Sequence, residues 1–165
     1  MNYLKSTFVF LFVLQLSACA WLEGGGLNSA KFGIAGESAA VAKPPGDQRA
    51  YRYTVLENGL KVLLISDAGA DKAAASLDVN VGSRQDPENY QGLAHFLEHM
   101  LFLGTEKYPE AGSYQAFITA HGGSHNAFTS FEDTNYFFDI SADSLEPALD
   151  QFAQFFVAPL FNACP

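Results

Sequence analysis

Apolar and β-branched residues in the first part of the globular region follow the patterns of β-strands. Two such runs, residues 51–56 and 60–65, flank Asn58 and Gly59, a pair whose tolerance of positive φ suits a tight hairpin. A third run, residues 75–81, alternates apolar with polar positions, which is typical of a strand with one buried face. We therefore expect three strands, the first two joined as a hairpin.

The segment 91–103 has helical periodicity and carries a stripe of polar residues. At about 100° per residue, His95, Glu98 and His99 fall within roughly a third of the helix circumference, and apolar residues cover most of the remainder. We expect a helix this apolar to be mostly buried. Burying two imidazoles and a carboxylate without partners is costly, so something must satisfy this stripe.

The second half of the chain predicts two more helices and two more strands. A helix over residues 113–120 is followed by strands over 126–129 and 135–140. A last helix is expected over 144–157, with Pro147 in its first turn, where an N–H has no intrahelical partner. The order of elements predicts an α+β domain, with helices packed on one face of an antiparallel-rich sheet.

The N-terminal segment has the pattern of an export signal. Residues 1–19 contain an apolar run, 8–16, that is too short to span a bilayer but suits a signal peptide. The tetrapeptide LSAC resembles the processing box of bacterial lipoproteins and predicts lipidation of Cys19, with residues 20–50 as a flexible tether and 51–165 as the globular part. This predicts a periplasmic protein anchored to the outer membrane of a Gram-negative-type bacterium. A soluble periplasmic protein with an ordinary cleavage site is the alternative.

Composition and charge narrow the classes of partner and of site. With 48% hydrophobic residues in 165, the chain is expected to form one compact domain. The 9 basic and 18 acidic side chains give a formal net charge of −9, which argues against nucleic-acid binding. Two cysteines make neither a disulfide framework nor a zinc finger. A metal site in this chain would therefore consist of histidine and carboxylate.

The polar stripe has the residue types and spacing of a catalytic zinc site. Histidines at i and i+4 of a helix, such as His95 and His99, can bind one ion, and an adjacent carboxylate, here Glu98, can act as general base. The order HxxEH is the reverse of the commoner HExxH. The simpler alternative is a helix with an incidental His and Glu face. His121 and His125 share the i, i+4 spacing, but two glycines between them predict turn and strand-entry residues.

Two longer strings carry a family resemblance. GLAHFLEHMLFLGTEKYP, residues 92–109, and HGGSHNAFTSFEDTNYFFDIS, residues 121–141, resemble the inverted-motif zinc metallopeptidases of the pitrilysin and insulin-degrading-enzyme family. The resemblance implies that His95 and His99 bind Zn²⁺, that Glu98 is the general base, and that peptide bonds in extended oligopeptides or unfolded segments are hydrolysed.

The resemblance also implies a substrate-binding strand. Asn126, Ala127 and Phe128 would line the substrate site, where the strand pairs with the main chain of a peptide. An ordinary strand is the simpler interpretation of these residues.

Part of the family's pattern lies outside this chain. The third zinc ligand of the family is a glutamate on a later helix, at a position beyond residue 165. Four acidic residues follow the second histidine without matching that motif, and we assign none of them as a ligand: Glu132, Asp133, Glu146 and Asp150. We therefore expect an incomplete first domain of a pitrilysin-like metallopeptidase, in which Cys164 has no evident role.

Two functional interpretations follow. The favoured one is the N-terminal part of a zinc endopeptidase that needs later domains or a partner subunit to close its active chamber. Alone, such a fragment is expected to bind zinc weakly and hydrolyse little, because two histidines do not complete a zinc site. The alternative is a non-catalytic peptide-binding or assembly module of the same fold. A purely structural envelope lipoprotein would leave the polar stripe unexplained.

Overall fold

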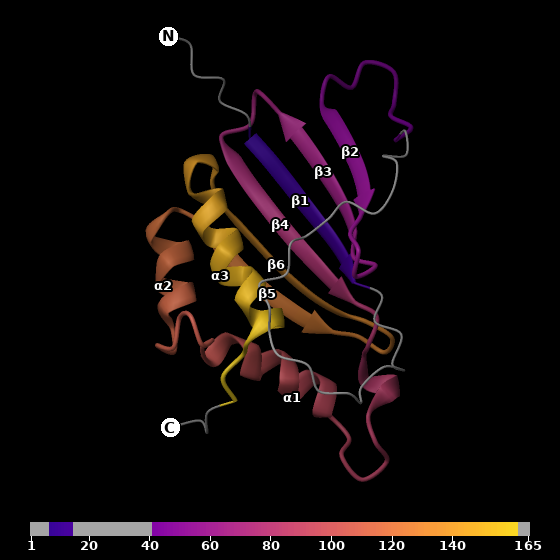
Figure 1. The fold of residues 1–165 in the computed structure, drawn as a ribbon, viewed down its shortest axis with the longest axis vertical. Helices are drawn as coiled ribbons and strands as arrows, with labels where there is room; N and C mark the ends of the chain where they lie inside the picture. Colours follow the sequence, from indigo (N-terminus) through magenta and orange to yellow (C-terminus); the bar gives the residue numbers. More distant parts are fainter. Residues whose placement is uncertain (1–6, 15–40, 162–165) are drawn as a thin grey trace.

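A computed structural model describes residues 7–14 and 41–161 of the chain, and within these it forms one six-stranded sheet with three α-helices (Figure 1). The strands are β1 (Thr7–Leu14), β2 (Ala50–Val55), β3 (Lys61–Asp67), β4 (Lys72–Val79), β5 (Ser124–Thr129) and β6 (Thr134–Ser141). The helices are α1 (Leu93–Met100), α2 (Ser113–Ala120) and α3 (Leu145–Val157). The strand order is β2-β3-β1-β4-β6-β5, and every neighbouring pair is antiparallel except β1 with β4.

The core lies between the centre of the sheet and two of the helices. Alternate residues of β4 and β6 point to this side, as the period of two predicts. Helices α2 and α3 lie over this face, and α1 lies across one end of the sheet (Figure 1). The buried residues that form the core are Ala73, Ala75, Leu77, Leu101, Tyr114, Ile118, Tyr136, Phe138, Ile140, Leu145, Ala148, Phe152 and Phe155. The predicted α+β class, with helices on an antiparallel-rich sheet, is confirmed.

The helix that carries the polar stripe is less buried than its composition predicts. Leu93, Phe96 and Leu97 are 45%, 59% and 43% exposed, whereas Glu98 and Met100 are buried. The prediction of a mostly buried helix was therefore wrong, because apolar composition does not reveal which face another element covers. The predicted span 91–103 is also divided, since α1 ends at Met100 and a 3₁₀ turn follows.

The apolar N-terminal run forms part of the sheet in this structure. Strand β1 lies between β3 and β4, antiparallel to the first and parallel to the second (Figure 1). A short continuous apolar run suits a central strand as well as a signal peptide, so its composition did not separate the two. Removal of residues 1–19 as a signal stays a prediction. Cys19, Cys164 and residues 20–40 of the predicted tether lie outside the described residues.

Within the described residues, no helix is long and apolar enough to cross a membrane.

Candidate metal centre

One turn of α1 brings three potential metal ligands together. The Nε2 atoms of His95 and His99 lie 3.1 Å apart, and their ring centroids lie 4.7 Å apart. One ligand atom from each of these histidines and one from Glu98 all lie within 4.8 Å of one another. Both imidazoles are exposed, whereas Glu98 is only 6% exposed. The i, i+4 spacing therefore produces the predicted cluster, with its carboxylate on the protein side.

The histidine pair fits a zinc ion. Two nitrogen ligands about 2.0–2.1 Å from a tetrahedral zinc stand about 3.3–3.4 Å apart, close to the 3.1 Å separation of His95 Nε2 and His99 Nε2. Zinc accepts nitrogen and oxygen donors, so the donor types fit as well. When no ion is bound, one of these two nitrogens can donate a hydrogen bond to the other. Among the described residues this is the one group of three or more such side chains that could hold a metal ion.

The start of α1 is fixed by a carboxylate from the preceding loop. Asp86 Oδ2 accepts a hydrogen bond of 2.7 Å from the backbone N–H of Gly92, and Asp86 Oδ1 accepts one of 2.8 Å from the N–H of Ala94. The first N–H groups of a helix have no intrahelical hydrogen-bond partner, and here the carboxylate of Asp86 accepts from two of them. Sequence reasoning missed Asp86, because it lies six and eight residues from its partners rather than at capping-box spacing.

Glu98 is bound from the sheet. Thr129 Oγ1 donates a 2.6 Å hydrogen bond to Glu98 Oε2 across 31 residues of sequence. Tyr136 of β6 lies nearby: burial, together with the charge of Glu98, raises the pKa of its phenol. Sequence reasoning did not single out Thr129, since no local pattern joins the end of a strand to a helix 31 residues earlier.

The other two histidines lie where the glycines between them predicted. His121 follows the last residue of α2, and its Nδ1 lies 2.8 Å from the carbonyl oxygen of Phe117. His125 lies in β5, its ring beside those of Phe102 and Tyr114, and burial lowers the pKa of its imidazole. Neither belongs to the metal-ligand group.

The predicted substrate-binding residues lie on an edge strand. Strand β5 ends the sheet order and pairs with β6 alone among the described strands. Asn126 and Phe128 are exposed, Phe128 at 49%, and Ala127 is half-buried. The outer edge of β5 therefore offers main-chain hydrogen-bonding groups, as peptide binding by strand addition requires.

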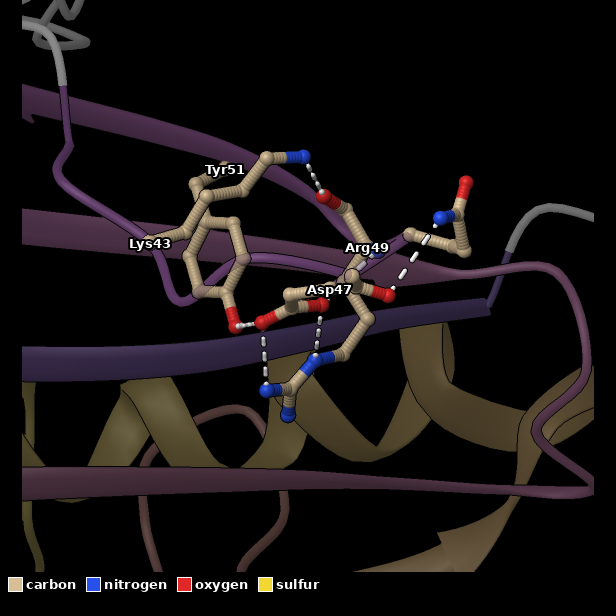
Figure 2. Close-up of polar contacts among 6 residues, drawn as sticks. Lys43, Asp47, Arg49 and Tyr51 are labelled. Atoms are coloured by element: carbon tan, nitrogen blue, oxygen red, sulfur yellow. Dashed lines mark hydrogen bonds and ion pairs between the residues drawn. The ribbon is translucent and has the colours of Figure 1, made fainter.

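A dense polar cluster at the opposite edge of the sheet has a different role. The Asp47 carboxylate binds the Arg49 guanidinium through two hydrogen bonds, of 2.9 and 2.7 Å, and accepts a third of 2.7 Å from the Tyr51 hydroxyl (Figure 2). Lys43 Nζ donates to the carbonyl of Arg49, 3.0 Å away (Figure 2). These contacts fasten the loop that enters β2, and they hold the pKa of Asp47 well below its usual range.

Comparison with known proteins assigns the chain to a family. Residues 61–164 match the family described as insulinase (peptidase family M16). The chain belongs to this family. It is 59% identical over 122 residues to the human insulin-degrading enzyme, covering 74% of this chain and 12% of that protein. It is also 59% identical over 123 residues to insulin-degrading enzyme-like 1, peroxisomal, from Arabidopsis thaliana, covering 74% and 13%.

A solved structure agrees with this assignment. The crystal structure of pitrilysin matches with a TM-score of 0.73 and 42% identity, covering 79% of this chain and 14% of that one. The family resemblance stated from the two sequence strings is therefore confirmed. This M16 chain spans about an eighth of the length of the curated relatives it matches.

The predicted location in a Gram-negative-type envelope was wrong. The human and plant relatives are eukaryotic proteins, and the plant protein is named as peroxisomal. The envelope prediction depended on the apolar run 8–16 together with the LSAC tetrapeptide. In the structure, residues 7–14 of this segment form the strand β1, which pairs with β3 and β4. Neither a lipoprotein nor a periplasmic protein is supported by these relatives.

Proposed function

We propose that this M16 chain carries the helix-borne part of a zinc peptidase site, with His95 and His99 as metal ligands and Glu98 as general base. The observation that carries the proposal is the facing pair of imidazole nitrogens, 3.1 Å apart, with a buried carboxylate beside them. The order of the three residues and their place on one helix are those that the family resemblance implies for an inverted-motif metallopeptidase.

The three side chains divide the chemical work. Zinc, when bound, lowers the pKa of a water molecule to about 7 and polarises a carbonyl oxygen. His95 and His99 would hold it through their Nε2 atoms. Glu98 receives the Thr129 hydrogen bond at Oε2, so its Oε1 is the oxygen that takes up a proton from the attacking water and later returns it to the leaving amine.

The substrate is proposed to be an extended peptide segment held along β5. Asn126, Ala127 and Phe128 lie on this edge strand, whose outer main-chain groups can pair with a peptide main chain. Main-chain pairing selects an extended conformation more than a particular sequence, which suits oligopeptides and unfolded segments.

A complete catalytic site needs more than these described residues. A catalytic zinc takes three protein ligands and keeps one open position. The ligand group found here contains two imidazoles and the proposed base. We propose that a further carboxylate ligand comes from residues outside this chain, and that the chain alone therefore binds zinc weakly and hydrolyses peptides slowly.

Titration of the full chain with zinc, monitored by isothermal calorimetry, tests the metal site. His95→Ala and His99→Ala should each weaken zinc binding at least about tenfold. His121→Ala is the matched control, because His121 is another exposed histidine near a helix end that lies outside the ligand group. Equal zinc binding by wild type, His95→Ala and His99→Ala would refute the proposal.

A fluorogenic peptide distinguishes the enzyme from a non-catalytic peptide-binding module. Zinc-dependent hydrolysis that Glu98→Gln removes supports the peptidase. Tight peptide binding by the zinc-loaded chain, with no hydrolysis even when the further M16 domains are supplied, would favour the binding module.

A further inference from the structure

The buried carboxylate of the metal centre has its hydrogen-bond partner on a different element. Thr129 is the last residue of β5, and its Oγ1 lies 2.6 Å from Oε2 of Glu98. We propose that Thr129 is the positioning residue for Glu98, holding one carboxylate oxygen so that the other faces the histidine pair. This inference rests on the proposed function, in which Glu98 is the general base.

The surrounding hydrogen bonds determine where the hydroxyl protons point. Thr134 Oγ1 lies 2.8 Å from the carbonyl oxygen of Val81 and 3.4 Å from Thr129 Oγ1. A carbonyl oxygen can only accept, so the single hydroxyl proton of Thr134 is committed to Val81. The proton of Thr129 is donated to Oε2 of Glu98.

The turn that follows Thr129 is fixed by several hydrogen bonds. The next residue, Ser130, donates from its backbone N–H to the carbonyl of Asp133 at 2.8 Å and from its hydroxyl to the Asp133 carboxylate at 2.5 Å. The carbonyl of Ser130 in turn accepts a 3.0 Å hydrogen bond from the N–H of Ser83, in the loop that leads to α1. The residue that follows Thr129 is therefore fixed by hydrogen bonds to Asp133 and to Ser83, which limits movement of the end of β5 that carries the Thr129 hydroxyl.

The alternation of side chains along β5 separates two tasks on one strand. Thr129 and Ala127 lie opposite Thr134 and Tyr136, two of the buried residues of β6, so they face the helix side of the sheet. Phe128 points to the other side and is 49% exposed. The strand can thus hold the base through Thr129 while its outer main-chain edge receives a peptide. The base and the proposed peptide-binding edge then share one rigid element.

Three variants of the full chain separate this role from general packing. Thr129→Val keeps the shape and removes the hydroxyl, whereas Thr129→Ser keeps the hydroxyl. Thr134→Val is the matched control, because it makes the same change at the paired residue. It removes the hydrogen bond to Val81 and the 3.4 Å contact with Thr129 Oγ1, and it leaves the hydrogen bond from Thr129 to Glu98 in place. The readout is the carboxyl ¹³C resonance of Glu98 in metal-free, glutamate-labelled protein at one fixed pH, assigned by its loss in Glu98→Gln.

The Glu98 resonance should shift and broaden in Thr129→Val, and keep its position in Thr129→Ser and Thr134→Val. With peptide substrate, Thr129→Val should lower kcat about 10- to 100-fold with little change in KM, and Thr129→Ser should restore most of the loss. An unshifted Glu98 resonance in Thr129→Val would overturn the proposal. If Thr129→Val does not fold, a displaced resonance in Thr129→Ser would overturn it.

The resonance test is independent of zinc. One pair of results is a Glu98 resonance that depends on the Thr129 hydroxyl and zinc binding that does not depend on His95 and His99. That pair of results would refute the proposed function and still support the hydrogen bond from Thr129 to Glu98. Zinc binding that depends on His95 and His99, together with a Glu98 resonance that is unchanged in Thr129→Val, would support the proposed function and refute the positioning role of Thr129.

Discussion

Asp86 accepts a 2.8 Å hydrogen bond from the backbone N–H of Ala94 and so fixes the first turn of the helix that carries the histidine pair. The same carboxylate also accepts from Gly92, so two of the four N-terminal N–H groups of α1 are satisfied by one side chain. The metal centre therefore depends on a loop residue that contacts neither imidazole.

Replacement of Asp86 should loosen α1. Asp86→Ala is expected to lower the free energy of unfolding by about 0.5–2 kcal/mol, the usual effect of losing an N-terminal cap. Asp86→Asn, which keeps one acceptor oxygen, should lose less. Glu88→Ala, a change at an exposed acidic residue of the same loop, is the control. Urea unfolding measures all three, and equal stability of Asp86→Ala and Glu88→Ala would contradict the capping role.

Gly82 lies where no side chain fits. A Cβ atom there would stand 2.6 Å from the carbonyl oxygen of Ser130 and 2.7 Å from the backbone nitrogen of Asp133. Because both are backbone atoms of the turn after Thr129, Gly82→Ala should lower the free energy of unfolding by about 1–3 kcal/mol or more. At Gly69 the one close atom is the end of a flexible side chain, 3.4 Å away, so Gly69→Ala is the matched control. If the thermal melting curves of Gly82→Ala and Gly69→Ala coincide, the turn can move aside to accept the added Cβ atom.

The local part of the site could be predicted from the sequence, and the long-range part could not. His95, Glu98 and His99 are separated by less than two helical turns, so helix geometry alone places them together. The contact from Thr129 to Glu98 depends on how a strand end meets a helix, and no period in the sequence encodes it. The exposure of Phe96 was missed for a related reason, since it depends on what lies above α1.

The fold, like the site, has local features that the sequence predicts and long-range features that it does not. The hairpin around Asn58, the helices α2 and α3, and the strands β5 and β6 agree with their predicted spans to within a few residues. The segment that forms β1 also has the pattern of an export signal, because seven of its eight residues are apolar and a short apolar run fits both structures. Its pairing with β3 and β4 cannot be derived from its composition.

Removal of β1 should therefore destabilise the sheet. A chain without residues 1–14 loses the strand that separates β3 from β4, and a chain without residues 1–6 keeps it. The larger deletion should lower the midpoint of thermal unfolding by roughly 4 °C or more relative to the smaller one. Identical midpoints would show that the folded domain does not need this strand and would revive the export-signal interpretation of the segment.

Acid should weaken the fold through two paired carboxylates. Lys72 and Ser124 hold the pKa of Asp139 below its usual range, and Lys107 and Tyr108 do the same for Asp150. Because the folded-state pKa is the lower one, this stabilisation is complete above the unfolded pKa of about 3.9 and is lost as the pH falls toward the folded values.

Urea unfolding between pH 7 and pH 3 measures this loss. Asp150→Asn should reduce both the stability at pH 7 and the decline in stability below about pH 4. Glu88→Gln, at an exposed position in the loop before α1, serves as the control. If the stability of Asp150→Asn declines as steeply in acid as that of the wild type, other groups cause the pH dependence.

X-ray absorption at the zinc edge tests the central claim most directly. The zinc-loaded chain should show two imidazole ligands at about 2.0–2.1 Å, reduced to one in His95→Ala and in His99→Ala and retained in Glu98→Gln and His121→Ala. Zinc without imidazole scattering, or with scattering that survives both α1 histidine substitutions, would contradict the assignment of α1 as the metal-binding helix.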